Sequence, residues 1–301
     1  MNATVQLLHF LVLANFPSGS SINYLEDKFY LLGDDARIIL VLDKNYLAID
    51  SVRIFDHFEK RIPKAEKADL EASAILSFNG DNYIAAVGSA STDKRKKLLL
   101  IPLAADGRID HAKPWVTHGT NEFVNRLTGA GISQVNIEGA SLKDGSLILA
   151  NRGNSSAPTN LLIITHDNFW VHSNQARLDI VTIEQPKAEG FLGISEVCYV
   201  PSNNMLLFIF TSERTGNALD DGPIGDSYIA WVMNATAKLN PPAIKMEGMI
   251  NLSDVSPQFK RQKIEGICLE SAETDRLLLH LISDNDDGKS KLFKVLVNLN
   301  R

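Results

Sequence analysis

The stretch Ile264-Glu265-Gly266-Ile267-Cys268-Leu269 is followed by a turn around residues 273–275 and by a strongly apolar run over residues 277–282. Turn residues between two runs of β-forming residues are the pattern of a β-hairpin. The motif consists of an apolar residue, then Glu or Ser, then a small or polar residue and a short apolar strand, followed by a turn and a second apolar strand. When such a motif recurs along a chain, it indicates a repeat architecture.

Four other segments carry the same motif. They begin at Leu25-Glu26-Asp27, Leu70-Glu71-Ala72, Ile137-Glu138-Gly139 and Ile194-Ser195-Glu196. In the first of them we expect strands over residues 29–32 and 38–42. The marker positions 26, 71, 138, 195 and 265 lie 45 to 70 residues apart, which leaves room for two further strands after each hairpin.

Third strands are indicated over residues 98–103, 161–165, 228–233 and 292–297. Four-stranded units repeated in this way predict an all-β fold, a β-propeller of five blades, with six blades as the alternative. The whole chain, residues 1–301, is then expected to form a single propeller domain.

The last repeat reaches the chain end just after its third strand, and the apolar run over residues 4–13 has no other partner. We therefore predict that residues 4–13 form the outer strand of the last blade and close the ring. The alternative is a signal peptide, but no Lys or Arg occurs before Lys28. The protein is expected to be cytoplasmic, or secreted or periplasmic if a signal peptide has been removed.

Composition excludes some classes of partner. Hydrophobic residues make up 45% of the 301 residues, charged residues 22%, and the net charge is -6. An acidic chain lacks the basic surface that nucleic acid needs, and no apolar run approaches the length of a membrane span. We expect neither nucleic acid nor membrane as a partner, and instead a small anionic ligand or another protein.

In a propeller the first strand of each blade lines a central channel, so equivalent positions converge. The marker residues expected to form a ring there are Glu26, Glu71, Glu138, Ser195 and Glu265. Crowded carboxylates repel one another and therefore need protons, basic partners or a cation. Ca²⁺ is the simplest answer, because it accepts six to eight oxygen ligands without strict geometry. The alternative is that each Glu only accepts hydrogen bonds from neighbouring blades.

Three places after each marker stand Phe29, Ala74, Ser141, Cys198 and Cys268, of which four are small. Small residues are expected where innermost strands crowd together. The two cysteines are thus predicted to be reduced core residues rather than redox or metal groups.

The loops after the second strands carry further charged residues on the same face as the ring. Lys44, Arg152 and Arg214 are candidates for binding an anionic ligand such as phosphate, and Glu213 or Asp284 for an acid near an attacking water. The alternative is that these basic residues pair with the acidic ring.

The run Gly193-Ile194-Ser195, with Val200-Pro201 and Ser212-Glu213 and the downstream Lys263-Ile264-Glu265-Gly266-Ile267, resembles the calcium-activated nucleotidase (apyrase) propellers. The phrases Ile137-Glu138-Gly139 and Ile264-Glu265-Gly266, with Ser283-Asp284-Asn285, also resemble the esterase-like phytase propellers. The nucleotidase resemblance implies five blades and a central Ca²⁺ held by Glu and Ser residues. It also implies Ser where this sequence has Glu26.

Two functions follow as hypotheses. The first is a Ca²⁺-dependent hydrolase of phosphate esters or anhydrides. The second is a non-enzymatic propeller that binds a protein or a small ligand, with the ion as a structural element.

Overall fold

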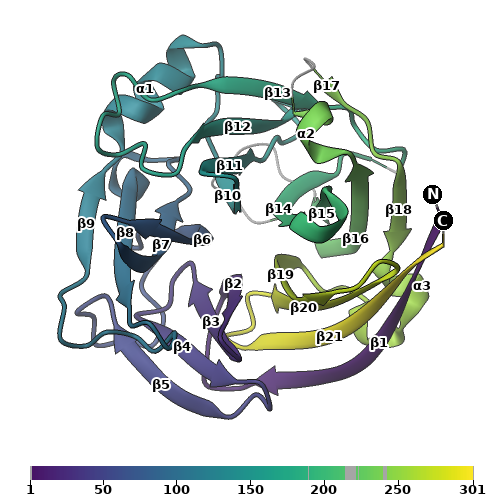
Figure 1. The fold of residues 1–301 in the computed structure, drawn as a ribbon, viewed down its shortest axis with the longest axis horizontal. Coiled ribbons are helices and arrows are strands. Elements are labelled where there is room, and N and C mark those ends of the chain that lie inside the picture. Colours follow the sequence, from purple (N-terminus) through teal and green to yellow (C-terminus); the bar gives the residue numbers. More distant parts are fainter. Residues whose placement is uncertain (1, 189, 214–221, 223, 240–242, 301) are drawn as a thin grey trace.

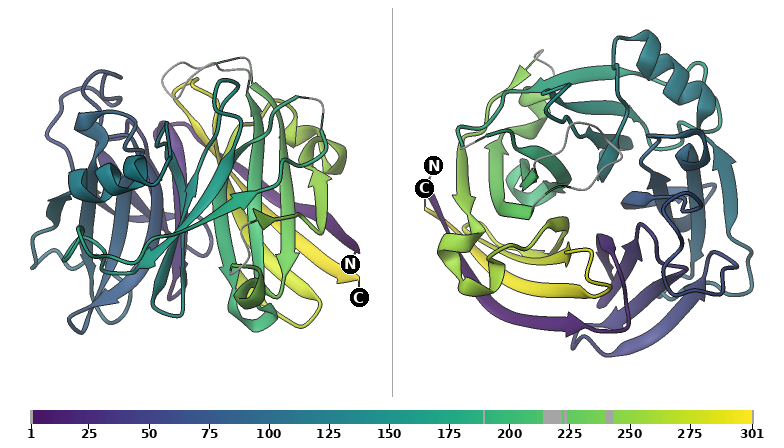
Figure 2. Two further views of the ribbon diagram at one scale, coloured as in Figure 1. Left: turned by 90° about the horizontal axis from the view of Figure 1, so that it is seen from above. Right: turned by 180° about the vertical axis from the view of Figure 1, so that it is seen from behind.

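Five sheets surround a central channel in the computed structural model, which describes residues 2–300 except 189, 214–221, 223 and 240–242 (Figure 1). Each sheet has four antiparallel strands, and one of them gains a short fifth, parallel strand. The strands within a sheet run roughly along the channel (Figure 2, left). The fold is the predicted five-bladed β-propeller, and the six-bladed alternative is wrong.

Each blade is built outward from the channel in chain order. Blade 1 has β2 (Gly19–Leu25), β3 (Lys28–Gly33), β4 (Ile38–Asp43) and β5 (Ala48–Arg53). Blade 2 has β6 (Leu70–Phe78), β7 (Asp81–Gly88), β8 (Lys97–Leu103) and β9 (Val116–Gly119). Blade 3 has β10 (Ile137–Lys143), β11 (Ser146–Asn151), β12 (Asn160–His166) and β13 (Asp179–Ile183), with β17 (Ala243–Ile244) alongside. Blade 4 has β14 (Gly193–Val200), β15 (Met205–Glu213), β16 (Ile224–Met233) and β18 (Gly248–Asn251).

Blade 5 closes the ring with a strand from the other end of the chain. It contains β19 (Ile264–Ala272), β20 (Arg276–Asp284), β21 (Ser290–Asn300) and β1 (Asn2–Leu13). β1 pairs antiparallel with β21 from Asn2 opposite Asn300 onward, so the two chain ends lie side by side (Figure 1). The predicted closing strand is confirmed. It removes a sheet edge that would otherwise offer unpaired backbone groups.

The first blade corrects one expectation. Residues 29–32 and 38–42 belong to the second and third strands, β3 and β4, and the innermost strand is β2. Glu26 and Asp27 form the tight turn between β2 and β3, both with positive φ. The error arose because Leu25-Glu26-Asp27 imitates the repeat motif, whereas β2 opens with the polar run Gly19-Ser20-Ser21.

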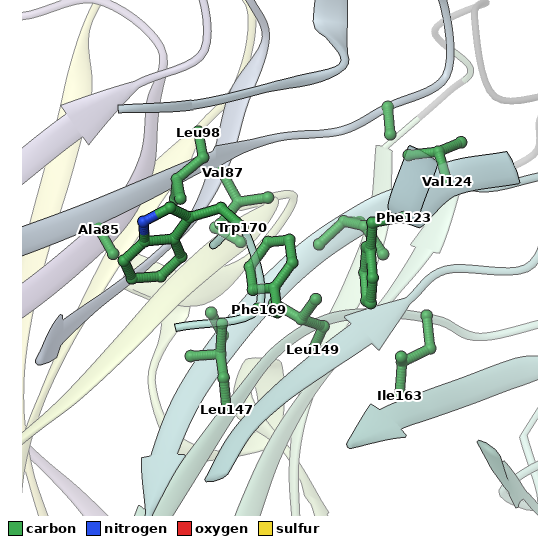
Figure 3. Packing of buried hydrophobic residues seen from close by; sticks show 14 of the residues in the cluster. Ala85, Val87, Leu98, Phe123, Val124, Leu147, Leu149, Ile163, Phe169 and Trp170 are labelled. Atoms are coloured by element: carbon green, nitrogen blue, oxygen red, sulfur yellow. The ribbon is translucent and has the colours of Figure 1, made fainter. Parts of the chain in front are cut away.

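Apolar side chains pack between neighbouring blades. Between blades 2 and 3 the core is extended by helix α1 (Asn121–Gly129), whose Phe123 lies 4.5 Å from Phe169 between ring centroids (Figure 3). The remaining short helices lie in connections: α2 (Ala235–Lys238), α3 (Leu252–Val255), and the 3₁₀ turns η1 (Asp93–Arg95), η2 (Pro201–Asn203) and η3 (Pro257–Phe259). Among the described helices none has the length and apolarity to cross a membrane.

His280 of blade 5 is buried and links that blade to blade 1. The contact lies at the end of the molecule where the innermost strands finish. Tyr46 Oη lies 2.7 Å from Nδ1 of His280, and Nε2 of His280 lies 2.6 Å from Glu270. Lys294 also contacts the Glu270 carboxylate, at 2.8 Å. Since a carboxylate only accepts, His280 donates through Nε2 and its Nδ1 accepts from Tyr46. Burial lowers the pKa of His280 to about 4, against the opposing effect of Glu270.

Candidate functional site

All five innermost strands carry a β-bulge at the same place near their start. The pairing shifts register between Gly19 and Ser21, Leu70 and Ala72, Ile137 and Gly139, Ile194 and Glu196, and Ile264 and Gly266. The residues inside the bulges are Ser20, Glu71, Glu138, Ser195 and Glu265. A bulge re-aims a side chain away from the regular alternation. We call the end of the channel where these residues lie the upper mouth.

Ser20, and not Glu26, is the blade 1 member of this set. The prediction that Glu26 lies in the ring is wrong, because the residue sits in the turn at the other end of β2. Ser20 is fully buried and donates to the Leu70 carbonyl at 2.6 Å, which links blade 1 to blade 2. The likeness of Gly19-Ser20-Ser21 to Ile194-Ser195-Glu196 is the sequence signal that could have found it.

The other four marker residues do come together. The pKa of Glu71 is raised well above its usual value, first by burial and then by nearby carboxylates that include Glu138 and Glu265. Glu138 and Ser195 share one partner: Arg152 Nη1 lies 3.6 Å from Glu138 Oε2 and donates to Ser195 Oγ at 3.1 Å. The structure therefore brings these four residues together at one end of the channel.

Basic side chains from the loops around the upper mouth meet most of the carboxylates. Lys263 Nζ lies 2.8 Å from Glu265, and Arg152 pairs with Glu138 as described above. Arg152 thus contacts the acidic ring, which was the alternative to its role in binding an anion. Buried carboxylates with a cation at this distance are largely neutralised within the protein.

Glu71 differs from the other ring glutamates. Its side chain has no hydrogen bond and no ion pair with any residue that the structure describes, and the charges near it are further acids and Lys67. Carboxylate oxygens of Asp34, Asp69 and Glu71 lie within 4.8 Å of one another. Asp34 follows β3 and Asp69 precedes β6, so the cluster spans blades 1 and 2.

Lys67 lies inside this cluster. Its Nζ forms ion pairs with Asp34 and, at 2.7 Å, with Asp69 Oδ1, while Arg95 contacts the other oxygen of Asp69 at 2.7 Å. The second oxygen of Asp34, Oδ1, is buried and has no hydrogen-bond partner. Burial, partly offset by Lys67, raises the pKa of Asp34 to about 6. Sequence reasoning missed Asp34 because it follows a misassigned strand of blade 1, and Asp69 because the residue before the marker motif differs in type between blades.

Asp284 borders the same mouth from blade 5. It ends β20, is 5% exposed, and has its pKa raised to about 7 by burial and by the charges of Asp34 and Asp286. Such a carboxyl can take up or release a proton near neutral pH. Asp284 is thus placed where the sequence predicted, beside the acidic ring.

The remaining predicted rim residues do not join this site. Lys44 follows β4 at the opposite end of the molecule and lies 3.5 Å from Asp27, with both side chains more than half exposed. Its predicted place beside the ring is wrong, because the misassigned strands of blade 1 reversed its direction. Glu213 ends β15, but its side chain lies outside the described part of the chain, as does the whole of Arg214.

The fold and site define a five-bladed propeller with an acidic channel mouth. Over residues 15–297 the chain matches the model of a family described as a family of unknown function (DUF6929), and it belongs to that family. No curated protein matches.

Two similar solved structures with TM-scores above 0.5 support the fold. Glutaminyl cyclase from Myxococcus xanthus is 10% identical over 99% of this chain and 98% of its own, with a TM-score of 0.56. The tail fibre of Staphylococcus aureus phage P68 is 12% identical with a TM-score of 0.51, and this chain covers 53% of its length. A DUF4221 family member from Bacteroides vulgatus is 10% identical over 99% of both chains, with a TM-score of 0.45. The resemblance to nucleotidase and phytase propellers is supported only as far as the propeller fold.

Proposed function

We propose that the upper mouth binds one divalent cation, Ca²⁺, through the carboxylates of Asp34, Asp69 and Glu71. The proposal rests on the 4.8 Å clustering of their oxygens together with the buried, unpartnered Oδ1 of Asp34. A buried oxygen without a donor is costly, and coordination to a cation would satisfy it. An all-oxygen donor set suits Ca²⁺, which tolerates irregular geometry better than Mg²⁺.

The proposed ligand set differs from the one expected from the sequence. Glu71 is common to both. Glu138 and Glu265 are paired with Arg152 and Lys263, whereas Asp34, although paired with Lys67, keeps a buried Oδ1 without a donor. We propose that Glu138 and Glu265 serve to hold Arg152 and Lys263 at the mouth rather than to bind the ion. Ser195 then serves to hold Arg152 in place at 3.1 Å.

Calorimetric titration of Ca²⁺ into chelator-treated protein tests the proposal. We expect one ion per chain, and a melting temperature that rises with ion concentration, since a ligand at about 100 times its Kd adds roughly 2.7 kcal/mol of stability. Glu71→Gln should weaken binding at least tenfold. Asp81→Asn is the matched control, because Asp81 is a half-exposed carboxylate paired with Lys113 away from the mouth. Equal binding by wild type and Glu71→Gln would contradict the proposal.

A second candidate function, hydrolysis of phosphate esters or anhydrides, is favoured by Asp284. A buried carboxyl with a pKa of about 7 at the channel mouth is suited to general acid or base work. A bound Ca²⁺ would supply Lewis acidity toward a phosphoryl oxygen. Phosphate release from a panel of esters and nucleotides, lost in Asp284→Asn, would support this function.

The remaining candidate is a binding propeller without turnover, in which the ion stabilises the mouth for a small anionic ligand or a protein partner. Stabilisation by Ca²⁺ with no phosphate release from the panel would favour it over the hydrolase.

A further inference from the structure

The outermost strand of blade 5, β1, differs from the outer strands of the other blades. It runs over 12 residues, whereas β5 has 6 residues and β9 and β18 have 4 each. In blade 3 the short strand β17 covers the outer edge of β13. β1 lies at the outside of the ring, and no strand in the described part of the chain pairs with its outer edge (Figure 1). It is therefore the longest open edge among the described strands.

The outward backbone groups of β1 have no backbone partner among the residues that the structure describes. One side of the strand pairs with β21, from Asn2 opposite Asn300 to Leu13 opposite Ser290. Beyond that pair, the described residues of β1 take part in one backbone hydrogen bond, from Phe16 N–H to the Leu13 carbonyl at 3.3 Å. A row of unpaired N–H and C=O groups is a template for another strand.

β1 also lacks the residues that usually protect an edge. Its 12 residues, Asn2–Leu13, include no Asp, Glu, Lys, Arg or Pro. The shorter outer strand β5, by contrast, carries Asp50 and Arg53. Apolar side chains of β1 are open to solvent as well, since Leu8 is 46% and Val12 is 41% exposed. Charge and proline are the common means of keeping an edge single, so their absence indicates an edge that pairs.

A β-bulge near the midpoint of β1 selects the partner. The pairing with β21 shifts register between Leu7 and His9, so Leu8 is the extra residue. A bulge bends a strand and disturbs its fit to a regular strand. A second copy of β1, related by a two-fold axis at Leu8, carries the same bulge at the same place and matches it. Charge agrees with this choice, because each chain has a net charge of -6 but β1 has no Asp, Glu, Lys or Arg.

We propose that two copies of this chain form a dimer through β1, which pairs antiparallel with its own copy around a two-fold axis near Leu8. The four-stranded sheets of the two fifth blades then join into one sheet. Pairing along the whole of β1 gives about ten hydrogen bonds, as many as a typical interface carries. A pair of four-residue strands such as β9 would give only about four.

Sedimentation equilibrium of the purified chain over a range of concentrations tests the interface. Wild type should form a dimer. Leu8→Lys places two like charges at the axis and should weaken dimerisation at least about tenfold. Val116→Lys is the matched control, because Val116 is 44% exposed on β9, the outer strand of blade 2. This control should dimerise as wild type does.

Cross-linking of Leu8→Cys tests the position of the axis. Opposite residues in antiparallel strands have Cα atoms about 4.5–5.5 Å apart, which a disulfide can span. Mild oxidation should therefore convert this variant into a covalent dimer, whereas Val116→Cys should remain a single chain under denaturing conditions. The two native cysteines are buried and should not contribute.

Three results would overturn the inference. The first is wild type that stays monomeric at every concentration, and the second is a dimer that Leu8→Lys does not weaken and Leu8→Cys does not cross-link. The third is a monomer in which the β1 amides facing away from β21 are protected from hydrogen exchange, because another segment would then cover the edge. None of these results bears on Ca²⁺ binding at the upper mouth.

Discussion

The upper mouth and the lower chamber, which is the part of the channel below the ring, are built from the same five innermost strands, yet they differ in charge. Residues at the bulges include three glutamates, whereas the residues three places further on are amides, hydroxyls, thiols and a methyl group. At the upper mouth the loops add Lys67, Arg95, Arg152 and Lys263. None of the chamber-lining residues is ionised in this way.

From this difference we infer that charged side chains occur along the channel only where loops can supply residues of opposite charge. Loops before the first strands and after the second strands meet only at the upper mouth. An innermost strand buried on all sides has no such supply, and an unpaired charge there would be costly. The upper mouth is therefore suited to hard ions and charged ligands, and the lower chamber to neutral ones.

The largest effect is expected for Lys67→Met. Methionine keeps the length of the side chain but leaves Asp34 and Asp69 without their ammonium, so chelator-treated protein should lose about 3–5 kcal/mol of stability. Because the ammonium no longer competes for the same oxygens, Ca²⁺ affinity should rise at least tenfold. Denaturant unfolding and calorimetry measure the two effects. Lys113→Met, which removes an exposed lysine bridging Asp81 and Asp110, is the matched control. A loss of Ca²⁺ affinity in Lys67→Met would contradict the competition.

A smaller effect is expected for Asp284→Asn, and it depends on pH. The pKa of Asp284 is raised from 3.8 to about 7, so its stabilising contribution is complete below pH 4 and is lost as pH rises toward 7. Between pH 4 and 7 the stability of chelator-treated wild type should therefore fall relative to the variant, by at most about 4 kcal/mol. Unfolding curves across this range measure the difference. Parallel pH profiles for the two proteins would refute the assignment.

Tyr46→Phe should have a more modest effect, on the opposite side of the ring. The change leaves Nδ1 of buried His280 without its donor, which costs about 1–2 kcal/mol. Since the contact lies far from the upper mouth, Ca²⁺ affinity should stay at the wild-type value. Thermal melting and calorimetry on the same sample check both expectations, and altered Ca²⁺ binding would show that the two regions are coupled.

The smallest effect is expected for Lys44→Ala. Its ion pair with Asp27 is long and exposed, so stability should change by less than about 0.5 kcal/mol. Ca²⁺ binding and any phosphate release should also be unchanged, because Lys44 lies at the other end of the molecule. A marked loss of Ca²⁺ binding or of phosphate release would contradict the placement of Lys44 outside the site.

Much of the fold was predictable because hairpins with turn chemistry recur in blades 2 to 5, and because β1 had no other partner. Blade 1 was misread for two reasons. Its innermost strand, β2, begins with polar residues that include Ser20, and the sequence around Glu26, in the turn after β2, matches the repeat motif. Glu71, Glu138, Ser195 and Glu265 were found because they share a repeat position. Asp34 occupies the repeat position of Asp284, and Asp69 that of Lys263, but the residue types at both positions vary between blades. No repeated residue type marks them in the sequence, and their meeting with Glu71 depends on how loops from two blades fold over the channel.

The cation site at the upper mouth is tested most directly by metal analysis of the untreated protein, paired with melting curves before and after chelation. The account predicts about one calcium per chain and a melting temperature that falls on chelation and returns when Ca²⁺ is added. Protein that contains no divalent ion, and whose melting is indifferent to both chelator and Ca²⁺, would contradict it.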